Sequence, residues 1–476
     1  MSSRALSTFD GDDTATANGT QRSAMEEGMI GKGKIGCAQA IAGDENALEK
    51  LTLVTLEPED DPKNMPLLRK WVVVLIISSA ALCATCTSSI AASAESGESL
   101  DFHVSKEVTI LGISLYVEGL GCGPLLLGPL SEFYGRNPVY WVSYFLFFVF
   151  SFPVAFAPNI TVFLIFRFIG GFAGSAFLSV AGGSVGDLFS NESVANPMAV
   201  YTASPFLGPV VGPLFSGFIN QNLNWRWTYR VQIIWAFVEL VALILFIPET
   251  FVPAILKRKA QKIRKHERME VYAPLEVQQK ELLFFDRMAL LLDLWNALVL
   301  GILYLAFQAF PIIFGEKHGF NVQMTGVSFL GIGIGLVIGT ISQPFWNRLH
   351  QREAMKYEGN PPPELRLMMG MPGGVLVSLG LFWIAFTTFP GVPWIVPELG
   401  SVPFGLGIIY VFTATFTYLV TAYRPIAASA MAANSALRSS FAAVFPLFAG
   451  QMYNRLGTVG ATALLAGLTA LMAPLP

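Results

Sequence analysis

The sequence predicts an all-α integral membrane protein, with twelve transmembrane helices in two six-helix halves. Three observations support this fold class: the composition, the recurrence of apolar runs, and the placement of positive charge. The chain has 476 residues, of which 53% are hydrophobic and only 13% are charged. A soluble globular domain carries about 25% charged residues. A chain this long and this poor in charge is typical of a protein with many membrane spans.

Apolar runs of about 20 residues, long enough to cross ~30 Å of hydrocarbon, recur after Arg69. Because the bilayer offers no partner for an unpaired backbone group, each run is predicted to be a helix. The expected helices are residues 71–93, 106–128, 138–157, 160–184, 195–218, 229–248, 288–312, 324–346, 367–389, 395–421, 425–450 and 458–476.

Lysine and arginine gather in loops that the twelve-helix count places on one side. The segment 249–287 holds nine of them, and the loop after the eighth run adds Arg348, Arg352, Lys356 and Arg366. Positive loops face the cytosol, so both termini are expected inside. Residues 255–268 suit either a basic amphipathic helix on the membrane surface or a solvated linker.

This pattern divides the chain into four parts. The polar residues 1–66 are expected to form a disordered cytosolic tail. Residues 67–250 form the first six-helix half, 251–287 a basic cytosolic linker, and 288–476 the second half. The tail has no basic-then-apolar stretch that would indicate a signal peptide.

The sequence argues against an enzyme, a metal site, a cofactor and a nucleic-acid partner. The stretch Gly28–Lys34 imitates a nucleotide-binding loop, but Ile35 replaces the required hydroxyl residue and no strand precedes it. No broad basic surface suggests nucleic acid. The histidines fall in expected loops, none at metal-ligand spacing: His103, His266, His318 and His350.

The short polar segment 123–138 joins the second and third expected helices. It resembles the loop 2–3 signature of the major facilitator superfamily, G-x-L-[AG]-D-[RK]-x-G-R-[RK]. Glu132 stands where the pattern has Asp, while Phe133 and Asn137 stand at positions that are usually basic. The resemblance implies a conformational gate made of Gly128, Glu132, Gly135 and Arg136.

The fifth expected helix contains Ser204-Pro-Phe-Leu-Gly-Pro-Val-Val-Gly-Pro-Leu-Phe-Ser-Gly217. Prolines remove helix hydrogen bonds, and glycines four apart allow close helix contact. The stretch resembles the antiporter signature Gly-Pro-x-x-Gly-Gly of drug:proton exporters; plain packing is the alternative. The positions that match or adjoin it are Gly208, Pro209, Gly212, Pro213 and Gly217.

The pairing of Trp225-Arg-Trp227 with Pro248-Glu-Thr250 resembles fungal members of the twelve-spanner drug:proton antiporter family. With later motifs, the resemblance covers about residues 62–476. It implies a proton-coupled exporter of drugs, polyamines or fungal metabolites that works by alternating access, with small organic compounds, protons and the lipid bilayer as its partners. A monomeric, multi-pass protein of the plasma membrane is expected.

Ionisable side chains inside the expected helices are candidates for proton coupling, because they are costly in hydrocarbon. Arg167 matches the helix 4 motif R-x-x-x-G of the superfamily. Glu118, alone or paired with Arg167, is the leading acid, and Asp187 closes the fourth helix. The alternatives are an arginine that snorkels to the interface and structural charge pairs that lock helices.

The resemblance implies a substrate cavity lined by helices 7 and 10, with further polar residues from helices 6 and 11; on its own, the aromatic stripe would indicate core packing. Gln308 and Thr421 stand where relatives commonly have acids, so the charge of the substrate stays open. Glu239 is a possible anchor for a cation. The cavity candidates are Glu239, Tyr304, Gln308, Tyr418, Asn434 and Arg438. An importer or facilitator on the same fold, and a non-transporting membrane sensor, are the alternative functions.

Overall fold

The computed structural model describes residues 52–53, 60–190, 193–267, 271–272, 287–357, 362–423 and 427–473. The Gly28–Lys34 stretch and most of the expected tail 1–66 lie outside the described residues. The described residues form two compact units, one drawn from residues 1–60 and 256–278 and one from residues 61–255 and 279–476.

The first unit contains two short strands that pair in parallel, β1 (Thr52–Leu53) and β2 (Val271–Tyr272). Helix α11 (Val252–Glu267) begins in the second unit and continues into the first. Within the first unit, the Nζ atom of Lys259 lies 2.9 Å from a carboxylate oxygen of Asp60. The first part of the expected basic linker is therefore helical.

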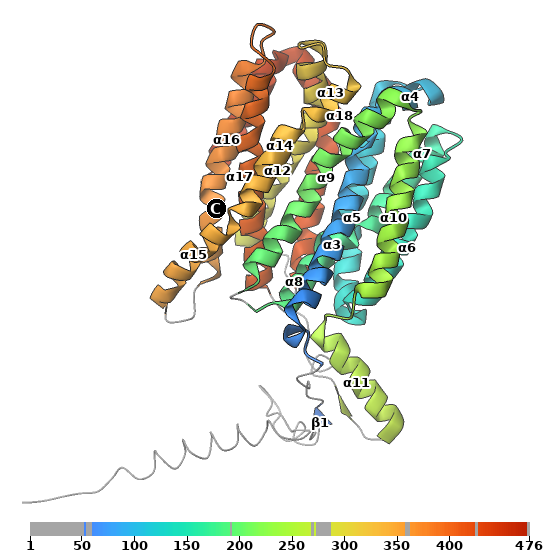
Figure 1. Ribbon diagram of the computed structural model, residues 1–476, viewed down its shortest axis with the longest axis vertical. Coiled ribbons are helices and arrows are strands. Elements are labelled where there is room, and N and C mark those ends of the chain that lie inside the picture. The colour runs from blue at the N-terminus through green and yellow to red at the C-terminus, as the bar shows by residue number, and fades with distance from the viewer. Residues whose placement is uncertain are drawn as a thin grey trace, which may run out of the picture. The chain divides into compact units, whose positions relative to one another are not determined.

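The second unit is a helical bundle that contains both expected halves. Figure 1 shows the helices of the first half, in blue to green, beside those of the second half, in yellow to red. The first half comprises η1 (Pro62–Asn64), α3 (Leu67–Ser89), α4 (Ala91–Phe102), α5 (Lys106–Tyr134), α6 (Arg136–Ala155), α7 (Ile160–Gly174), α8 (Ala176–Leu188), α9 (Ala195–Asn222) and α10 (Arg226–Phe246).

The second half begins with α12 after the linker. It comprises α12 (Arg287–Phe310), the π-helical turn η3 (Pro311–Glu316), α13 (Val322–Val327), α14 (Leu330–Ile341), α15 (Gln343–Ala354), η4 (Met355–Tyr357), η5 (Pro363–Met369), α16 (Gly370–Thr387), α17 (Ile395–Ala422) and α18 (Ala427–Met472). Below, the α4 end and the α15 end denote the two opposite ends of the bundle that carry these helices (Figure 1).

Within the described residues, eleven helical stretches are long and apolar enough to cross a membrane. The last, Ser429–Met472, contains a break at Gly457, whose φ of 69° lies in the left-handed region. Glycine adopts that conformation without steric cost, so the chain turns there and continues as a second segment. The structure therefore agrees with twelve spans.

The first membrane helix differs from the sequence prediction, which ended it at residue 93. Ile90 keeps helical backbone angles, so α4 follows α3 directly and runs to Phe102. The segment 91–102 is rich in Ala, Ser, Gly and Glu, and an apolar-run criterion excludes it. It is helical because protein, rather than hydrocarbon, surrounds its acidic side chains: Glu95 and Glu98 are buried.

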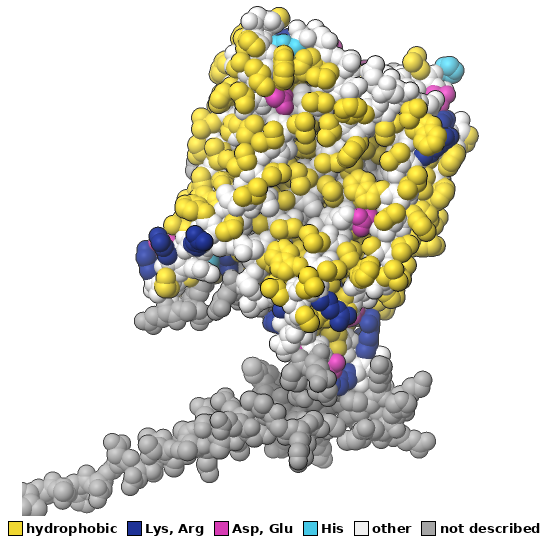
Figure 2. Space-filling view, viewed as in Figure 1, with side chains coloured by type: hydrophobic (Ala, Val, Ile, Leu, Met, Phe, Trp, Pro, Cys, Tyr) yellow, Lys and Arg dark blue, Asp and Glu magenta, His cyan; other side chains and the backbone are white. Residues whose placement is uncertain are grey.

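The surface of the bundle is apolar over most of the face in Figure 2, with lysine and arginine side chains at its two ends. Large side chains such as Ile234, Leu245 and Phe345 are more than half exposed. A soluble protein rarely exposes so continuous an apolar surface, whereas a bilayer requires it.

Candidate functional site

The junction between α5 and α6 lies at the α15 end and is set by Gly135. Its φ of 98° is unfavourable for residues with a side chain. A Cβ at this position would also collide with the carboxyl group of Glu249. Both constraints favour glycine, and the sharp turn places Glu132 and Arg136 on successive helices.

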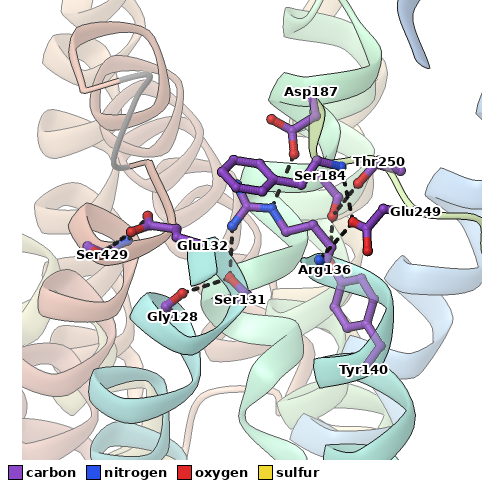
Figure 3. Close-up of polar contacts among 11 residues, drawn as sticks. Gly128, Ser131, Glu132, Arg136, Tyr140, Ser184, Asp187, Glu249, Thr250 and Ser429 are labelled. Carbon is purple, nitrogen blue, oxygen red and sulfur yellow. Dashed lines mark hydrogen bonds and ion pairs between the residues drawn. The ribbon is translucent and has the colours of Figure 1, made fainter. Parts of the chain in front are cut away.

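Arg136 is buried, with 2% of its surface exposed. Its Nε donates to the Oδ2 of Asp187 at 3.1 Å, and its Nη1 donates to the Oγ of Ser131 at 2.8 Å. Its backbone N–H donates to Glu249 at 2.8 Å, and its guanidinium lies 4.6 Å from the ring centre of Phe251. Figure 3 shows these groups converging on Arg136 from α5, α8 and the segment after α10.

Two carboxylates contact Arg136 in this cluster. Asp187, which the sequence suggested for proton coupling, pairs here with Arg136. Glu249 belongs to the Pro-Glu-Thr motif, which the sequence marked only as a family feature. Because a buried cation needs compensating negative charge, the carboxylates of Asp187 and Glu249 supply it for Arg136.

Glu132 connects the two halves. Its carboxylate accepts hydrogen bonds from the backbone N–H of Ser429 at 3.2 Å and from the hydroxyl of Ser429 at 3.0 Å. Ser429 lies in the first turn of α18, where N–H groups lack helical partners and the dipole is positive. A second contact at this end joins Asn347 of α15 to Asn196 of α9, also across the halves.

Arg167 lies inside the first half and is 1% exposed. Its three donor nitrogens bond to backbone carbonyls: Nε to Gly112 at 3.1 Å, Nη1 to Thr87 at 2.9 Å and Nη2 to Ser88 at 3.3 Å. Its guanidinium also lies 4.6 Å from the ring centre of Tyr116. The side chain is thus enclosed by α3 and α5 rather than extended toward the lipid interface.

Glu118 lies half-buried on α5, facing the other half. It accepts a hydrogen bond from the hydroxyl of Ser440 in α18 at 3.2 Å, and Cys122 approaches it at 3.6 Å. The hydrogen bonds of Arg167 go to carbonyl oxygens instead. The suggested Glu118–Arg167 pair is therefore not a hydrogen-bonded contact in this structure.

Two cavity candidates lie at the boundary between the halves, toward the α4 end. The hydroxyl of Tyr304 in α12 is 2.7 Å from the hydroxyl of Ser88 in α3. The amide of Gln308, one turn further along α12, donates to Glu95 of α4 at 2.8 Å. Gln308 thus has an acid beside it, supplied by the first half.

Three further candidates lie in the second half. Asn434 donates to Asp293 at 2.7 Å. The guanidinium of Arg438 in α18 lies 5.0 Å from the ring centre of Phe416 in α17. Tyr418, also in α17, is buried. These side chains place a buried polar group between α12, α17 and α18.

Glu239 lies apart from the other cavity candidates. It accepts hydrogen bonds from Ser79 of α3 and from the indole N–H of Trp235, at 3.3 Å for the latter. All three residues belong to the first half, between α3 and α10. The structure does not bring Glu239 together with Tyr304 or Gln308.

Helix α9 packs closely on α3 through its glycines. A Cβ at Gly208 would meet the side chain of Thr85 and, at 2.7 Å, the backbone N of Cys86. The carbonyl of Gly208 accepts from Ser89 at 3.1 Å. Near the α4 end, Gly217 approaches the carbonyl of Val322 in α13, so α9 also reaches the other half.

Glu95 and Glu98 were not among the candidate residues predicted from the sequence, because the first helix was expected to end at residue 93. The available signal was their spacing: two acids three apart share a helix face. Among the described residues, no group of three or more His, Cys, Asp and Glu side chains is arranged to hold a metal ion.

A family model described as "Major Facilitator Superfamily" matches residues 77–446. The chain belongs to the major facilitator superfamily. Among curated members, it is 44% identical over 448 residues to "Efflux pump atB" of Aspergillus terreus, covering 89% of this chain and 86% of that protein. It is 38% identical to "Probable drug/proton antiporter YHK8" of Saccharomyces cerevisiae, covering 88% and 85%.

Solved structures of the superfamily share the fold. The proton:xylose symporter XylE, bound to a glucose analogue, aligns with a TM-score of 0.62 at 14% identity, covering 86% of this chain and 95% of XylE. The human organic anion transporter MFSD10 aligns with a TM-score of 0.61 at 18% identity, covering 86% and 100%. The chain is therefore a multi-pass membrane transporter of the superfamily.

Proposed function

We propose that this transporter is a proton-coupled antiporter that exports small organic compounds by alternating access. The observation that carries the mechanism is that hydrogen bonds join the halves at both ends. Glu132–Ser429 lies at the α15 end, and Ser88–Tyr304 and Gln308–Glu95 lie toward the α4 end. A rocking motion that opens one end breaks one set while the other set holds.

The direction and the coupling are proposed from the relatives. Two similar proteins are named as an efflux pump and as a probable drug/proton antiporter. The substrates proposed here are drugs, polyamines or fungal metabolites. Glu118 is proposed as a coupling acid because it faces the other half, and Arg167 as the cation that fixes the surrounding backbone.

We place the α15 end in the cytosol because the basic residues Arg348, Arg352, Lys356 and Arg366 lie there, which puts the N-terminus inside. A monomer in the plasma membrane is the proposed form. The gate of Glu132, Arg136 and Asp187 then closes the cytosolic end. The sites of Tyr304 and Gln308 line the path toward the outside.

Purified protein in liposomes tests this function. Vesicles with an acidic lumen are given ethidium, spermidine or benzoate, and accumulation is compared with vesicles in which nigericin has removed the pH gradient. Antiport predicts accumulation above the external concentration that nigericin abolishes. Equilibration that ignores the gradient would indicate a facilitator, and no movement of any compound would favour a sensor.

A further inference from the structure

Two glutamates of α4 form an acid pair at the α4 end of the interface between the halves. Glu95 is 4% exposed and Glu98 is fully buried. Their spacing of three places them on one face of the helix. Buried carboxylates are normally paired with cations, yet neither forms a salt bridge among the described residues.

Among the described residues, each acid accepts a hydrogen bond from one side chain. The Oε1 of Glu95 accepts from Gln308 of the second half at 2.8 Å. The Oε1 of Glu98 accepts from the hydroxyl of Tyr229 in α10 at 2.7 Å. The Oε2 of Glu98 is buried and has no hydrogen-bond partner in the part of the chain that the structure describes. One oxygen of this acid is thus left free inside the protein.

The cations nearest the pair, Lys106 and Arg167, form no ion pair with it among the described residues. Arg167 of α7 reaches the ring of Tyr229, 5.7 Å from its centre, but donates its N–H groups to carbonyls of α3 and α5. Lys106 and Glu107, at the start of α5, are exposed. Helix α9, which packs on α4, contains no Asp, Glu, Lys, Arg or His. At the far end of α4, Asp101 pairs with Arg226.

The surroundings of the pair therefore depend on whether the halves are closed. With the interface closed, an ionised carboxylate would be buried without a cation, so the neutral, protonated form is favoured. Parting the halves breaks the Glu95–Gln308 bond and admits water, which favours the ionised form. The acid pair is coupled in this way to the movement that transports substrate.

We propose that Glu95 and Glu98 form a proton-exchange site of this transporter, in addition to Glu118. The inference rests on the proposed antiport. With the α4 end open, the hydrated carboxylates exchange protons with the solution on that side. As this end closes, a carboxylate oxygen takes up a proton from that solution, because burial favours the neutral acid, and Gln308 donates to the carbonyl oxygen of the protonated Glu95. Reopening the α4 end returns the proton to the same solution, so closure of this end depends on the pH on that side.

Infrared difference spectroscopy tests the site without any substrate. Purified protein is stepped from acidic to alkaline buffer, and the carboxylic C=O band that disappears is recorded. Glu95→Gln and Glu98→Gln should each remove part of this band, because glutamine cannot ionise. Glu107→Gln, which changes an exposed acid of α5, is the matched control. It should leave unchanged the part of the C=O band that the two α4 variants remove. A band that both α4 variants retain in full would overturn the proposal.

Transport gives the second test, with whichever of ethidium, spermidine or benzoate the wild type accumulates. Glu95→Gln and Glu98→Gln should lower gradient-driven accumulation by at least about tenfold. They should retain exchange of labelled for unlabelled compound at equal pH, since exchange needs no net proton movement. A variant that still exchanges the compound is folded and has lost only its coupling to protons. Glu118→Gln is measured together with the two α4 variants.

The two proposals fail in different ways. If the wild type accumulates nothing, the proposed antiport fails, while the infrared band still decides whether Glu95 and Glu98 bind protons. If the wild type accumulates substrate and both α4 variants respond fully to the gradient, the antiport stands and the acid pair is excluded as a coupling site.

Discussion

Glu132 of α5 accepts two hydrogen bonds from Ser429 of α18, at 3.2 Å from the backbone N–H and 3.0 Å from the hydroxyl. The two residues are 297 positions apart in the chain and belong to different halves. The carboxylate faces the positive N-terminus of α18, which strengthens the contact. This bond is the latch that we propose must break each time the α15 end opens.

Removing the latch should favour the state that is open at the α15 end. Hydrogen bonds to a charged group contribute about 1.5–3 kcal/mol each, so Glu132→Ala should shift the equilibrium by at least about tenfold. A reporter cysteine at Gln343, which is buried at that end, should be labelled faster by a water-soluble maleimide. Ser429→Ala removes only the hydroxyl bond and should have a smaller effect. Equal labelling rates in the wild type, Glu132→Ala and Ser429→Ala would contradict the latch.

Arg136→Ala should abolish transport without preventing membrane insertion. The substitution leaves the partly buried carboxylate of Asp187 without its cation, which destabilises the closed state. Liposome transport and the amount of protein in the membrane fraction are the two measurements. Arg352→Ala, which removes an exposed arginine of α15, is the control and should transport normally. Unchanged efflux in Arg136→Ala would exclude the gate.

Gly208→Val should destabilise the packing of α9 on α3. The added side chain would meet Thr85 and Cys86, and overpacking of this kind costs about 1–3 kcal/mol. The expected result is a lower thermal-unfolding temperature of the detergent-solubilised protein. Gly450→Val is matched to it, because nothing lies within 4 Å of a Cβ at that position in α18. Similar unfolding temperatures for the two variants would show that the close contact is unimportant.

Glu118→Gln should uncouple transport from the pH gradient. Glutamine keeps an oxygen for the hydroxyl of Ser440 but carries no titratable proton. Exchange at equal pH should persist while gradient-driven accumulation falls. Glu107→Gln again serves as the control. Full gradient-driven uptake by Glu118→Gln would remove this residue from the coupling mechanism.

The gate illustrates how far sequence reasoning reached. Gly135 and Arg136 were identified from a partial signature, and the structure shows Arg136 buried in a polar cluster behind Gly135. Its partners were not predictable from the signature alone. Asp187 and Glu249 lie 51 and 113 positions away from Arg136, and only packing brings them together.

The acid pair on α4 illustrates where the sequence misled. An apolar-run criterion assumes that a membrane helix faces lipid, whereas α4 buries Glu95 and Glu98 among protein groups. Likewise, Gln308 was read as the loss of an acid. The structure shows that Glu95, from the other half, lies in hydrogen-bond contact with it.

The sequence by itself determined that this chain is a twelve-span membrane protein, because backbone groups in hydrocarbon must pair within a helix and the chain repeats apolar runs of spanning length. It also determined where the chain bends sharply, since glycine and proline restrict the backbone locally. Which acids meet which donors was decided only by the tertiary structure. Those contacts join residues of different helices and halves, and no local pattern specifies them.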